Sequence, residues 1–317
     1  MKILKELYEI YSPSGGEKRL RRYIANYVKR NIPEAIYSVD KSGNLFITKG
    51  VSESYPCIVA HLDQVQEVHS KDFKAVETAD IIFGYSAKNR RQEGLGADDK
   101  NGIWIALKCL ERCEALKVAL FVQEEVGCVG SRHANLDFFD DCRFVIGCDR
   151  KGHKDMITDI SWTNLCSDEF VRDTDFKRFG YQEREGFITD VGELKGRGLA
   201  ISCINLSCGY YEPHTDNEFT VKADLLKCFD FVQHIIKTCT KVYIHNDTGY
   251  LDFEESTYYG NMDLSEIEEL TYLAQEILEE YPDYTADELY DMYGYYFPTL
   301  DIMDFEGVIN DFNKQQL

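Results

Sequence analysis

The sequence has few prolines and few positive charges for its length. Among its 317 residues there are 6 prolines, and no Pro-rich linker interrupts the first 247 residues. Lys and Arg number 35 against 56 Asp and Glu, so the formal net charge is −21, and the basic residues form no long run. Nucleic acid and anionic membrane surfaces are therefore poor partners, because binding to phosphate depends on clustered Lys and Arg.

Long apolar runs are also missing. No stretch approaches the roughly 20 apolar residues that a membrane span needs, and Glu6 and Glu9 interrupt what would be the core of a secretory signal. The 11 cysteines include no CxxC pair, and several lie in apolar runs, as Cys57, Cys148 and Cys203 do. We therefore expect a cytoplasmic protein with reduced, buried thiols.

The negative charge is concentrated at the end of the chain. Residues 251–317 contain 8 Asp and 10 Glu against one Lys, a net charge of −17. This shift in composition predicts a separate segment. Helical caps and apolar stripes over 263–282 and 285–297 indicate ordered helices in it. We expect a first domain over 1–247 and an acidic, Tyr-rich helical extension over 248–317 that packs on it; a substrate gate or partner surface is the alternative role.

Apolar strands alternate with amphipathic helices along the first domain. Branched apolar runs predict buried strands ending near residues 61, 123, 149 and 207. Helical spacing marks 3–11, 16–31, 100–116 and 222–239, with a further helix over 162–180; residues 35–50 read as a hairpin and 79–86 as a short strand. This alternation predicts an α/β fold, a three-layer α/β/α sandwich around a mixed, mostly parallel central sheet.

Ionisable side chains follow the predicted strands. In open α/β sheets, ligands bind beyond the carboxyl ends of the strands, so these groups are expected to converge on one edge. They are His61 and Asp63, Glu124 and Glu125, Asp149, and His214, together with Asp98 and Asp99, which open a helix after the loop EGLGADDKNG.

So many carboxylates in one place would repel each other and would lose hydration on burial. Within these motifs, Lys100 and Arg150 are the candidates for offsetting the charge. Divalent cations are the natural alternative. His together with Asp and Glu suits Zn²⁺ or a neighbouring transition metal, and the lack of Cys in the set argues against a closed structural zinc site.

Five segments, in the order AHLDQV, GADDKNG, QEEVGCVGS, GCDRKG and EPHTDNE, resemble the co-catalytic di-zinc exopeptidase superfamily. Its members include aminopeptidases, tripeptidases, glutamate carboxypeptidases and N-acyl-amino-acid deacylases. The resemblance runs from about Leu4 to about Lys241. It implies the zinc-exopeptidase (phosphorylase/hydrolase-like) catalytic domain over 1–247, and a metal-dependent hydrolase that cleaves an amide bond.

The resemblance implies two divalent metal ions, Zn²⁺ with Co²⁺ or Mn²⁺ as alternatives. The implied ligands are His61, Asp98 and Asp149 for one ion, and Asp98, Glu125 and His214 for the other. Glu124 would be the general base that takes a proton from a water shared by the ions. Asp63 would orient His61 through its second ring nitrogen. The resemblance also implies a cis peptide between Asp98 and Asp99.

The chain departs from many relatives in one respect, and several alternatives accompany this assignment. Many relatives carry an inserted dimerisation or lid domain, but only 36 residues separate His61 from Asp98, and only 64 separate Asp149 from His214. The chain therefore resembles the single-domain aminopeptidase branch, and we expect an aminopeptidase acting on short peptides. A carboxypeptidase or N-acyl-amino-acid deacylase is the alternative. It would need a cationic pocket, for which the chain offers Arg150, Arg184 and Arg197. A non-catalytic scaffold is a third hypothesis, and the oligomeric state is open.

Other polar residues have weaker assignments. Three neutral donors are candidates for stabilising an oxyanion: Asn205, Tyr210 and Tyr211. Five histidines lie outside the motifs and are not expected to bind metal: His69, His133, His153, His234 and His245.

Overall fold

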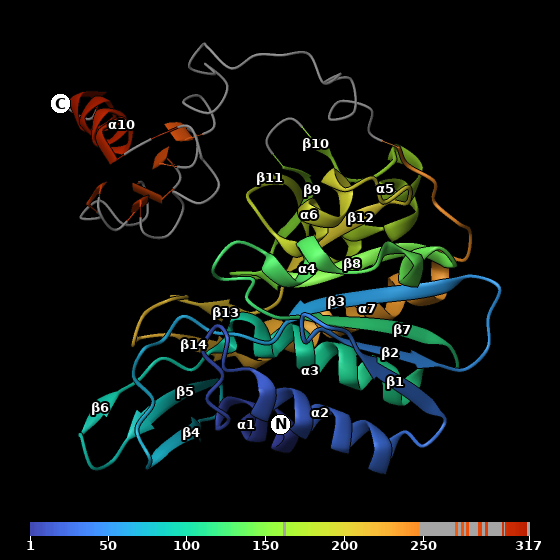
Figure 1. Cartoon of the computed structure of the whole chain (residues 1–317), viewed down its shortest axis with the longest axis horizontal. Coiled ribbons are helices and arrows are strands. Elements are labelled where there is room, and N and C mark those ends of the chain that lie inside the picture. The colour runs from blue at the N-terminus through green and yellow to red at the C-terminus, as the bar shows by residue number, and fades with distance from the viewer. Residues whose placement is uncertain are drawn as a thin grey trace. The chain divides into compact units, whose positions relative to one another are not determined.

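The computed structural model describes residues 1–160 and 163–246, and beyond them residues 270, 271, 274, 275, 277, 278, 285, 286, 289, 290, 300 and 302–315. The chain forms two compact units, residues 1–250 and 251–317 (Figure 1). The boundary predicted between residues 247 and 248 lies outside the described residues. Within the described part, no helix has the length and apolar character that crossing a bilayer requires.

A mixed sheet runs through the first unit in the order β1-β2-β7-β3-β8-β12-β9-β10, and β11 pairs with β9. The four central strands β7, β3, β8 and β12 run parallel, while β1, β2 and β10 pair antiparallel with their neighbours. The mixed sheet is as predicted, with its parallel pairing mainly in the centre. The strands are β1 (Ala35–Val39), β2 (Leu45–Lys49), β3 (Tyr55–His61), β7 (Leu116–Phe121), β8 (Cys142–Arg150), β9 (Asp155–Ile160), β10 (Thr163–Asn164), β11 (Gln182–Gly186) and β12 (Cys203–Ser207).

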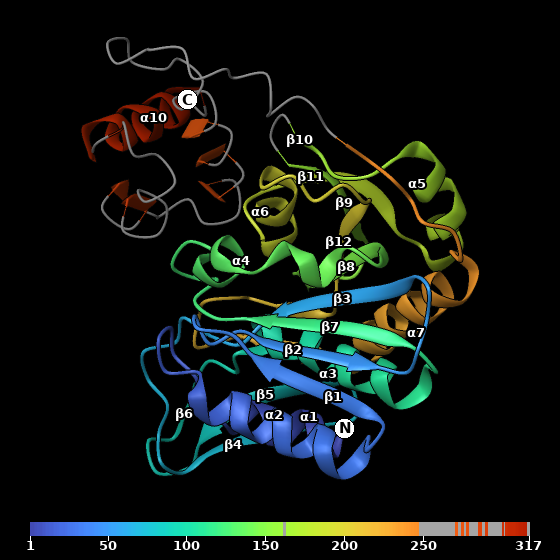
Figure 2. The ribbon, with the colours of Figure 1, turned by 45° about the vertical axis from the view of Figure 1, so that its right-hand side comes forward.

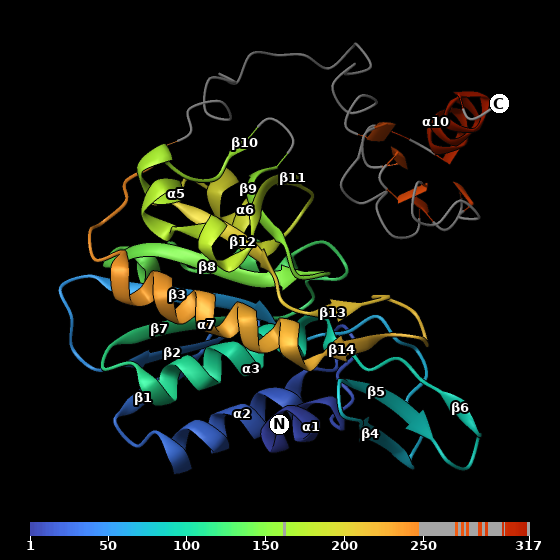
Figure 3. The same cartoon turned by 180° about the vertical axis from the view of Figure 1, so that it is seen from behind.

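Helices cover both faces of this sheet (Figure 2). On one side α3 (Ala97–Arg112) contacts β3, β7 and β8, and α1 (Lys2–Tyr8) and α7 (Lys222–Thr238) pack against α3 (Figure 3). On the other side α6 (Asp190–Gly196) contacts β3, β8 and β12, and α4 (Val129–His133) contacts β7 and α6. The remaining helices of this unit are α2 (Lys18–Asn31), α5 (Asp168–Thr174), η1 (Leu136–Phe139) and η2 (Phe176–Phe179). The three-layer prediction is confirmed.

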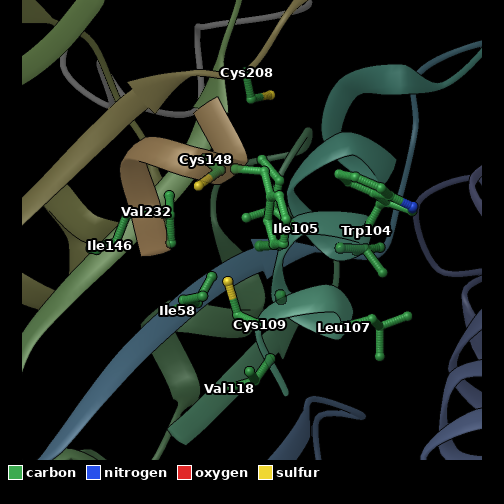
Figure 4. Close-up of a cluster of buried hydrophobic side chains, with 14 of the residues drawn as sticks. Ile58, Trp104, Ile105, Leu107, Cys109, Val118, Ile146, Cys148, Cys208 and Val232 are labelled. Atoms are coloured by element: carbon green, nitrogen blue, oxygen red, sulfur yellow. The ribbon is translucent and has the colours of Figure 1, made fainter. Parts of the chain in front are cut away.

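The central strands are apolar on both faces because the side chains of each face pack into a separate hydrophobic core. Along β3, Ile58 and Ala60 join the core under α3, whereas Cys57 and Val59 join the core under α6. Figure 4 shows the first core, where Ile105 and Cys109 of α3 lie against β3 and β8. Burying such a side chain contributes about 1.5–3 kcal/mol, so the two cores hold the strand ends in place. Ten of the eleven cysteines are buried, as predicted.

A smaller antiparallel sheet lies beside the central one and was not predicted as a separate unit. Its order is β13-β14-β5-β4, with β6 paired to β5. It joins the segment between His61 and Asp98 to the segment around His214 (Figure 1). The strands are β4 (Phe73–Glu77), β5 (Ile81–Ser86), β6 (Arg91–Gln92), β13 (Tyr210–Tyr211) and β14 (Phe219–Val221).

Two helices differ from what the sequence predicted. The helix expected over 162–180 is shorter and interrupted: Thr163 and Asn164 form β10, α5 begins at Asp168, and Asp175 adopts a left-handed φ of 53° between α5 and η2. In the second unit, α10 (Ile302–Gln315) is a described helix that was not predicted. The helices predicted over 263–282 and 285–297 fall largely outside the described residues. Packing of the acidic extension on the first domain stays a prediction.

Candidate metal centre

The parallel strands bring the predicted groups to one edge of the sheet. His61 is the last residue of β3 and lies in register with Phe121, the last residue of β7. Glu124 and Glu125 follow β7 by three and four residues, and Asp149 lies near the end of β8. The peptide between Asp98 and Asp99 at the start of α3 is cis. Strand order thus places at one edge the residues that come from distant parts of the chain.

Two groups of potential ligands form there and share Asp98. In the first group, Nε2 of His61 lies 3.1 Å from Oδ1 of Asp98 and 3.6 Å from Oδ1 of Asp149. In the second, Nε2 of His214 lies 3.5 Å from Oδ2 of Asp98 and 3.2 Å from Oε2 of Glu125. Within each group all ligand atoms lie within 4.8 Å of one another. Asp98 therefore presents one oxygen to each group, which is the arrangement of a bridging carboxylate.

The electrostatics of the edge are unbalanced without a cation. Burial raises the pKa of Asp149 well above its ordinary value, and the charge of Asp98 raises it further. Burial also raises the pKa of Glu124 well above its usual range. For Asp98 burial acts in the same direction, but hydrogen bonds from His214 and His61 outweigh it, and the pKa ends well below 3.8. The carboxylates outnumber the two imidazoles that face them.

The residues present fit a pair of divalent ions. The nitrogen and oxygen donors are those that Zn²⁺ and its neighbours accept. Oε1 of Glu125 is buried and has no hydrogen-bond partner, which is costly unless a cation or water meets it. The charge of Lys100 is not directed at the carboxylates, because its Nζ donates to Oε1 of Gln64. Arg150 lies 3.8 Å from Asp155.

Asp63 touches the backbone of the two adjacent glutamates. Its Oδ1 accepts a hydrogen bond from the amide of Glu124 at 3.0 Å, and its Oδ2 accepts one from the amide of Glu125 at 3.2 Å. Oδ2 also accepts from the hydroxyl of Ser14 at 2.7 Å. Nδ1 of His61 lies 3.3 Å from Oδ1, close enough for an ion pair but not aligned as a hydrogen bond. Asp63 therefore links three segments of the site.

The backbone is strained at two points of the site. Gln123, just before the glutamate pair, has a φ of 54°, and His214 has a φ of 63°. Residues with a Cβ rarely adopt this left-handed region, which costs about 1–3 kcal/mol per residue and persists where surrounding contacts impose it. At Gln123 one such contact is visible, since its amide donates to Oε1 of Glu17 at 3.2 Å.

The three candidate oxyanion donors have other partners. Asn205 exchanges two hydrogen bonds with the backbone of Asp149, at 2.9 and 2.8 Å. The hydroxyl of Tyr210 donates to Oδ1 of Asp149 at 3.3 Å, and that of Tyr211 donates to Asp224 at 2.7 Å. The oxyanion interpretation is therefore not supported. Asn205 and Tyr210 instead fix the position of Asp149.

Arg184, Arg197 and the remaining histidines lie outside the two ligand groups found in the described part of the chain. Arg197 donates to the carbonyl of Ser131 at 2.6 Å, and Arg184 is exposed on β11. The five histidines set aside from the sequence do not join either ligand group found among the described residues. They are His69, His133, His153, His234 and His245.

Sequence reasoning missed three residues around the site. Ser14 lies in the SPSG segment, which was interpreted only as a helix break. Asp190 begins α6; it is buried, its Oδ1 has no hydrogen-bond partner, and burial raises its pKa to about 7. Glu218 accepts hydrogen bonds from the backbone at the start of α3. Glu218 ends the quoted segment EPHTDNE, so that segment carried a signal for it.

Solved structures of the same fold include aminopeptidases and a tripeptidase. An aminopeptidase, PepT, from Bacillus cereus is 14% identical, with a TM-score of 0.60 over 76% of this chain and 98% of its own. A tripeptidase from Staphylococcus aureus is 15% identical, with a TM-score of 0.60 over 74% of this chain and 96% of its own. The chain has the fold of these aminopeptidases and tripeptidases. An aminopeptidase from the archaeon Desulfurococcus kamchatkensis gives a TM-score of 0.59 at 15% identity, over 74% of this chain and 93% of its own.

Sequence comparison is more limited than structural comparison. No protein-family model matches the chain. A protein of Pyrobaculum aerophilum, named provisionally as a LysW-lysine/LysW-ornithine hydrolase, is 36% identical over 63 residues. This match covers 20% of the chain and 18% of that protein. The peptidase fold is thus established by structure, whereas the chemistry has to be argued from the site.

Proposed function

We propose that this chain is a metal-dependent aminopeptidase that removes N-terminal residues from short peptides. The observation that carries the proposal is the pair of ligand groups that share Asp98, with the carboxylate of Glu124 beside them. Oε2 of Glu124 lies 4.0 Å from Nε2 of His61. An acidic group beside the two ligand groups, but a member of neither, supports the proposal that Glu124 is the general base.

The proposed ligands are His61, Asp98 and Asp149 for one ion and Asp98, Glu125 and His214 for the other, with Zn²⁺ as the proposed metal. Two ions bound there would lower the pKa of a bound water and polarise the scissile carbonyl. Glu124 would accept the proton of that water at its carboxylate and later deliver it to the leaving amine. The thiol of Cys128 donates to Oε1 of Glu124 at 3.5 Å and leaves Oε2 facing His61. Asp63 would hold the Glu124–Glu125 backbone, so that one carboxylate binds metal while the other handles the proton.

Charge favours a free amino terminus over a free carboxylate in the substrate. The edge of the sheet carries Asp63, Asp98, Asp149 and the glutamate pair, so two bound divalent ions would leave no excess positive charge there to attract a substrate carboxylate. Arg197 and Arg150 already have partners at the carbonyl of Ser131 and at Asp155. A carboxypeptidase or deacylase would need such a cation for the substrate carboxylate. The names of the structural neighbours, aminopeptidase and tripeptidase, agree with this choice.

The test is a hydrolysis assay on the full chain with Zn²⁺, Co²⁺ or Mn²⁺ added. Fluorogenic aminoacyl amides and free tripeptides should be cleaved, N-acetylated versions of the same substrates should not, and a chelator should abolish turnover. If the N-acetylated versions are cleaved and the substrates with a free amino terminus are not, the deacylase or carboxypeptidase alternative replaces the proposal. If no peptide is cleaved with any of the metals, the enzyme assignment is wrong.

A further inference from the structure

The three chain segments that carry His61, Asp98 and His214 are tied together by a row of buried polar side chains. Each segment supplies members of the row a few residues after its own ligand. Gln64 and Gln66 follow His61, Lys100 follows Asp98, and Glu218 follows His214. All four side chains belong to buried residues, with at most 7% of the residue surface exposed.

The row has the amine of Lys100 at one end and the carboxyl of Glu218 at the other, joined by two side-chain amides. Nζ of Lys100 donates to Oε1 of Gln64. Nε2 of Gln64 donates to Oε1 of Gln66 at 2.8 Å, and Nε2 of Gln66 donates to Oε2 of Glu218 at 3.2 Å. A buried row of this kind is stable only when its members satisfy each other, because a single missing partner leaves a buried polar atom unpaired. The row therefore fixes the relative position of the three segments.

Glu218 also holds the loop that carries the shared ligand. Its Oε2 accepts a hydrogen bond from the amide of Gly96 at 2.5 Å, and its Oε1 accepts from the amides of Ala97 at 2.9 Å and Asp98 at 3.1 Å. These amides lie ahead of the regular part of α3, because Asp98 and Asp99 have non-helical backbone angles, so their N–H groups have no helical partner and need another acceptor. One carboxylate thus meets three consecutive amides, the last of which belongs to Asp98.

Gly94 and Gly96 leave room for the side chains of the row to pack against the backbone of this loop. A Cβ at position 94 would lie 2.2 Å from Cγ of Gln66, and a Cβ at position 96 would lie 2.8 Å from Nζ of Lys100 and Cδ of Gln64. Gly96 also has a φ of 63°. Larger residues at either position would displace the row, so the glycine-bearing loop and the buried side chains form one unit.

We propose that Glu218 is a positioning residue that sets the orientation of Asp98 between the two ligand groups. Gln66 and Gln64 connect Glu218 by hydrogen bonds to the segment that carries His61. The proposal rests on the proposed function, since it assigns Glu218 a role at the same metal centre. Residues that orient metal ligands from behind typically change metal affinity or activity by about 10–100-fold when they are altered. Asp98 is shared, so displacing it should weaken both groups at once.

The experiment compares Glu218→Gln with Glu93→Gln. Glu93 is also buried, and its carboxylate accepts hydrogen bonds from Ser70 and Asn89 rather than from a ligand-bearing segment. Zn²⁺ binding is measured by calorimetry on metal-free protein, and the visible absorption bands of the Co²⁺-loaded protein report the geometry around the ions. In Glu218→Gln, an NH₂ group replaces one carboxylate oxygen and would face N–H donors, from which it cannot accept a hydrogen bond. We expect at least about a tenfold loss of affinity, with altered Co²⁺ bands. Glu93→Gln should bind Zn²⁺ like the wild type, with unchanged bands.

A second variant covers the case in which Glu218→Gln does not fold, as judged by circular dichroism. Gln66→Met breaks the row at its centre while keeping a side chain of similar length, and it should change the Co²⁺ bands in the same direction by a smaller amount. Wild-type affinity and wild-type bands in a folded Glu218→Gln, or in Gln66→Met where the first variant is unfolded, would overturn the inference. If the wild type binds two ions but hydrolyses no peptide, the proposed function fails while the binding comparison still decides the role of Glu218. If the wild type binds no ion, both are wrong.

Discussion

Asp63 holds Glu124 by its backbone: Oδ1 of Asp63 accepts a hydrogen bond from the Glu124 amide at 3.0 Å. The two residues are 61 positions apart in the sequence and follow the ends of the neighbouring parallel strands β3 and β7. The same carboxylate accepts from Glu125 and Ser14 and lies beside His61. A residue assigned from the sequence to orient one histidine therefore also supports the proposed base and a proposed ligand.

Asp63→Asn should damage the site more than the loss of one histidine contact would. The amide nitrogen of Asn would face an N–H or O–H donor, leaving buried groups unpaired at a cost of about 1–3 kcal/mol. We expect a loss of activity of about 10–100-fold and a lower urea midpoint. Ser14→Ala removes only one of the bonds and is the matched control. Equal effects of the two variants on activity would contradict the role given to Asp63.

Glu124→Gln should separate metal binding from proton transfer. Glu124 lies outside both ligand groups, so the variant should retain about two ions per chain, measured by elemental analysis. General acid–base catalysis contributes about 10²–10⁴-fold, and we expect a fall in kcat within that range. Glu125→Gln is the comparison, because it should lose metal as well as activity. A Glu124→Gln variant with near wild-type turnover would show that another group takes the proton.

Bound metal should raise the free energy of unfolding. This stabilisation should depend most on Asp98, because Asp98 belongs to both ligand groups. An ion that binds only the folded state adds about 2.7 kcal/mol when present at 100 times its Kd, so Tm should rise when Zn²⁺ is added to chelator-treated protein. Asp149→Asn affects one ligand group and should keep part of the rise. Asp98→Asn affects both groups and should lose most of it. Scanning calorimetry checks this order, and a full response in Asp98→Asn would exclude the shared-ligand arrangement.

The stability of the first unit should depend on pH through His69, which lies outside the ligand groups. Burial lowers the pKa of His69 to about 4, the charge of Lys100 adds to this, and Glu93 opposes it. The ring packs between Tyr11 and Phe73, with centroids 5.1 and 4.2 Å away. In the unfolded chain His69 binds a proton near pH 6.5, whereas in the folded chain it binds one only near pH 4. The free energy of unfolding should therefore fall as the pH falls from about 6.5 towards 4.

The test of this pH dependence is His69→Phe, which keeps an aromatic ring but cannot take a proton. With chelator present in every sample, the urea midpoint of the wild type should fall more between pH 7.5 and pH 5 than that of the variant. Identical changes in the two proteins would mean that His69 does not contribute to the acid sensitivity.

Gly130→Ala should strain the packing of α4. A Cβ there would lie 2.5 Å from the carbonyl oxygen of Val122 and from Oδ1 of Asn44, which accepts the Val122 amide. Backbone atoms cannot move aside cheaply, so we expect a loss of about 1–3 kcal/mol in the free energy of unfolding. Gly196→Ala, where a Cβ meets nothing within 4 Å, is the control and should be close to neutral. Urea unfolding of the two variants measures the difference.

Much of the candidate site could be predicted because its members stand at strand ends. His61, Glu124 and Asp149 each follow or end an apolar run, and parallel strands bring such positions together whatever their separation in sequence. The helix over 162–180 could not be predicted correctly, because the left-handed turn at Asp175 leaves no clear mark in the local pattern. Of the small sheet, only the strand over 79–86 was predicted, and it corresponds to β5; the other strands are short and come from two distant segments.

The amino-acid sequence alone determined the layered α/β class, the chemical types at the sheet edge and the need for a positive charge among them. Periodicity and composition report these properties because they depend on neighbouring residues. Only the tertiary structure decided which polar groups form hydrogen bonds with each other. Asn205 and Tyr210 bond to Asp149, and Glu218 accepts hydrogen bonds from the amides of the Asp98 loop, more than a hundred residues away in the sequence. Those pairings depend on side-chain directions and close packing across the whole domain, which no local pattern encodes.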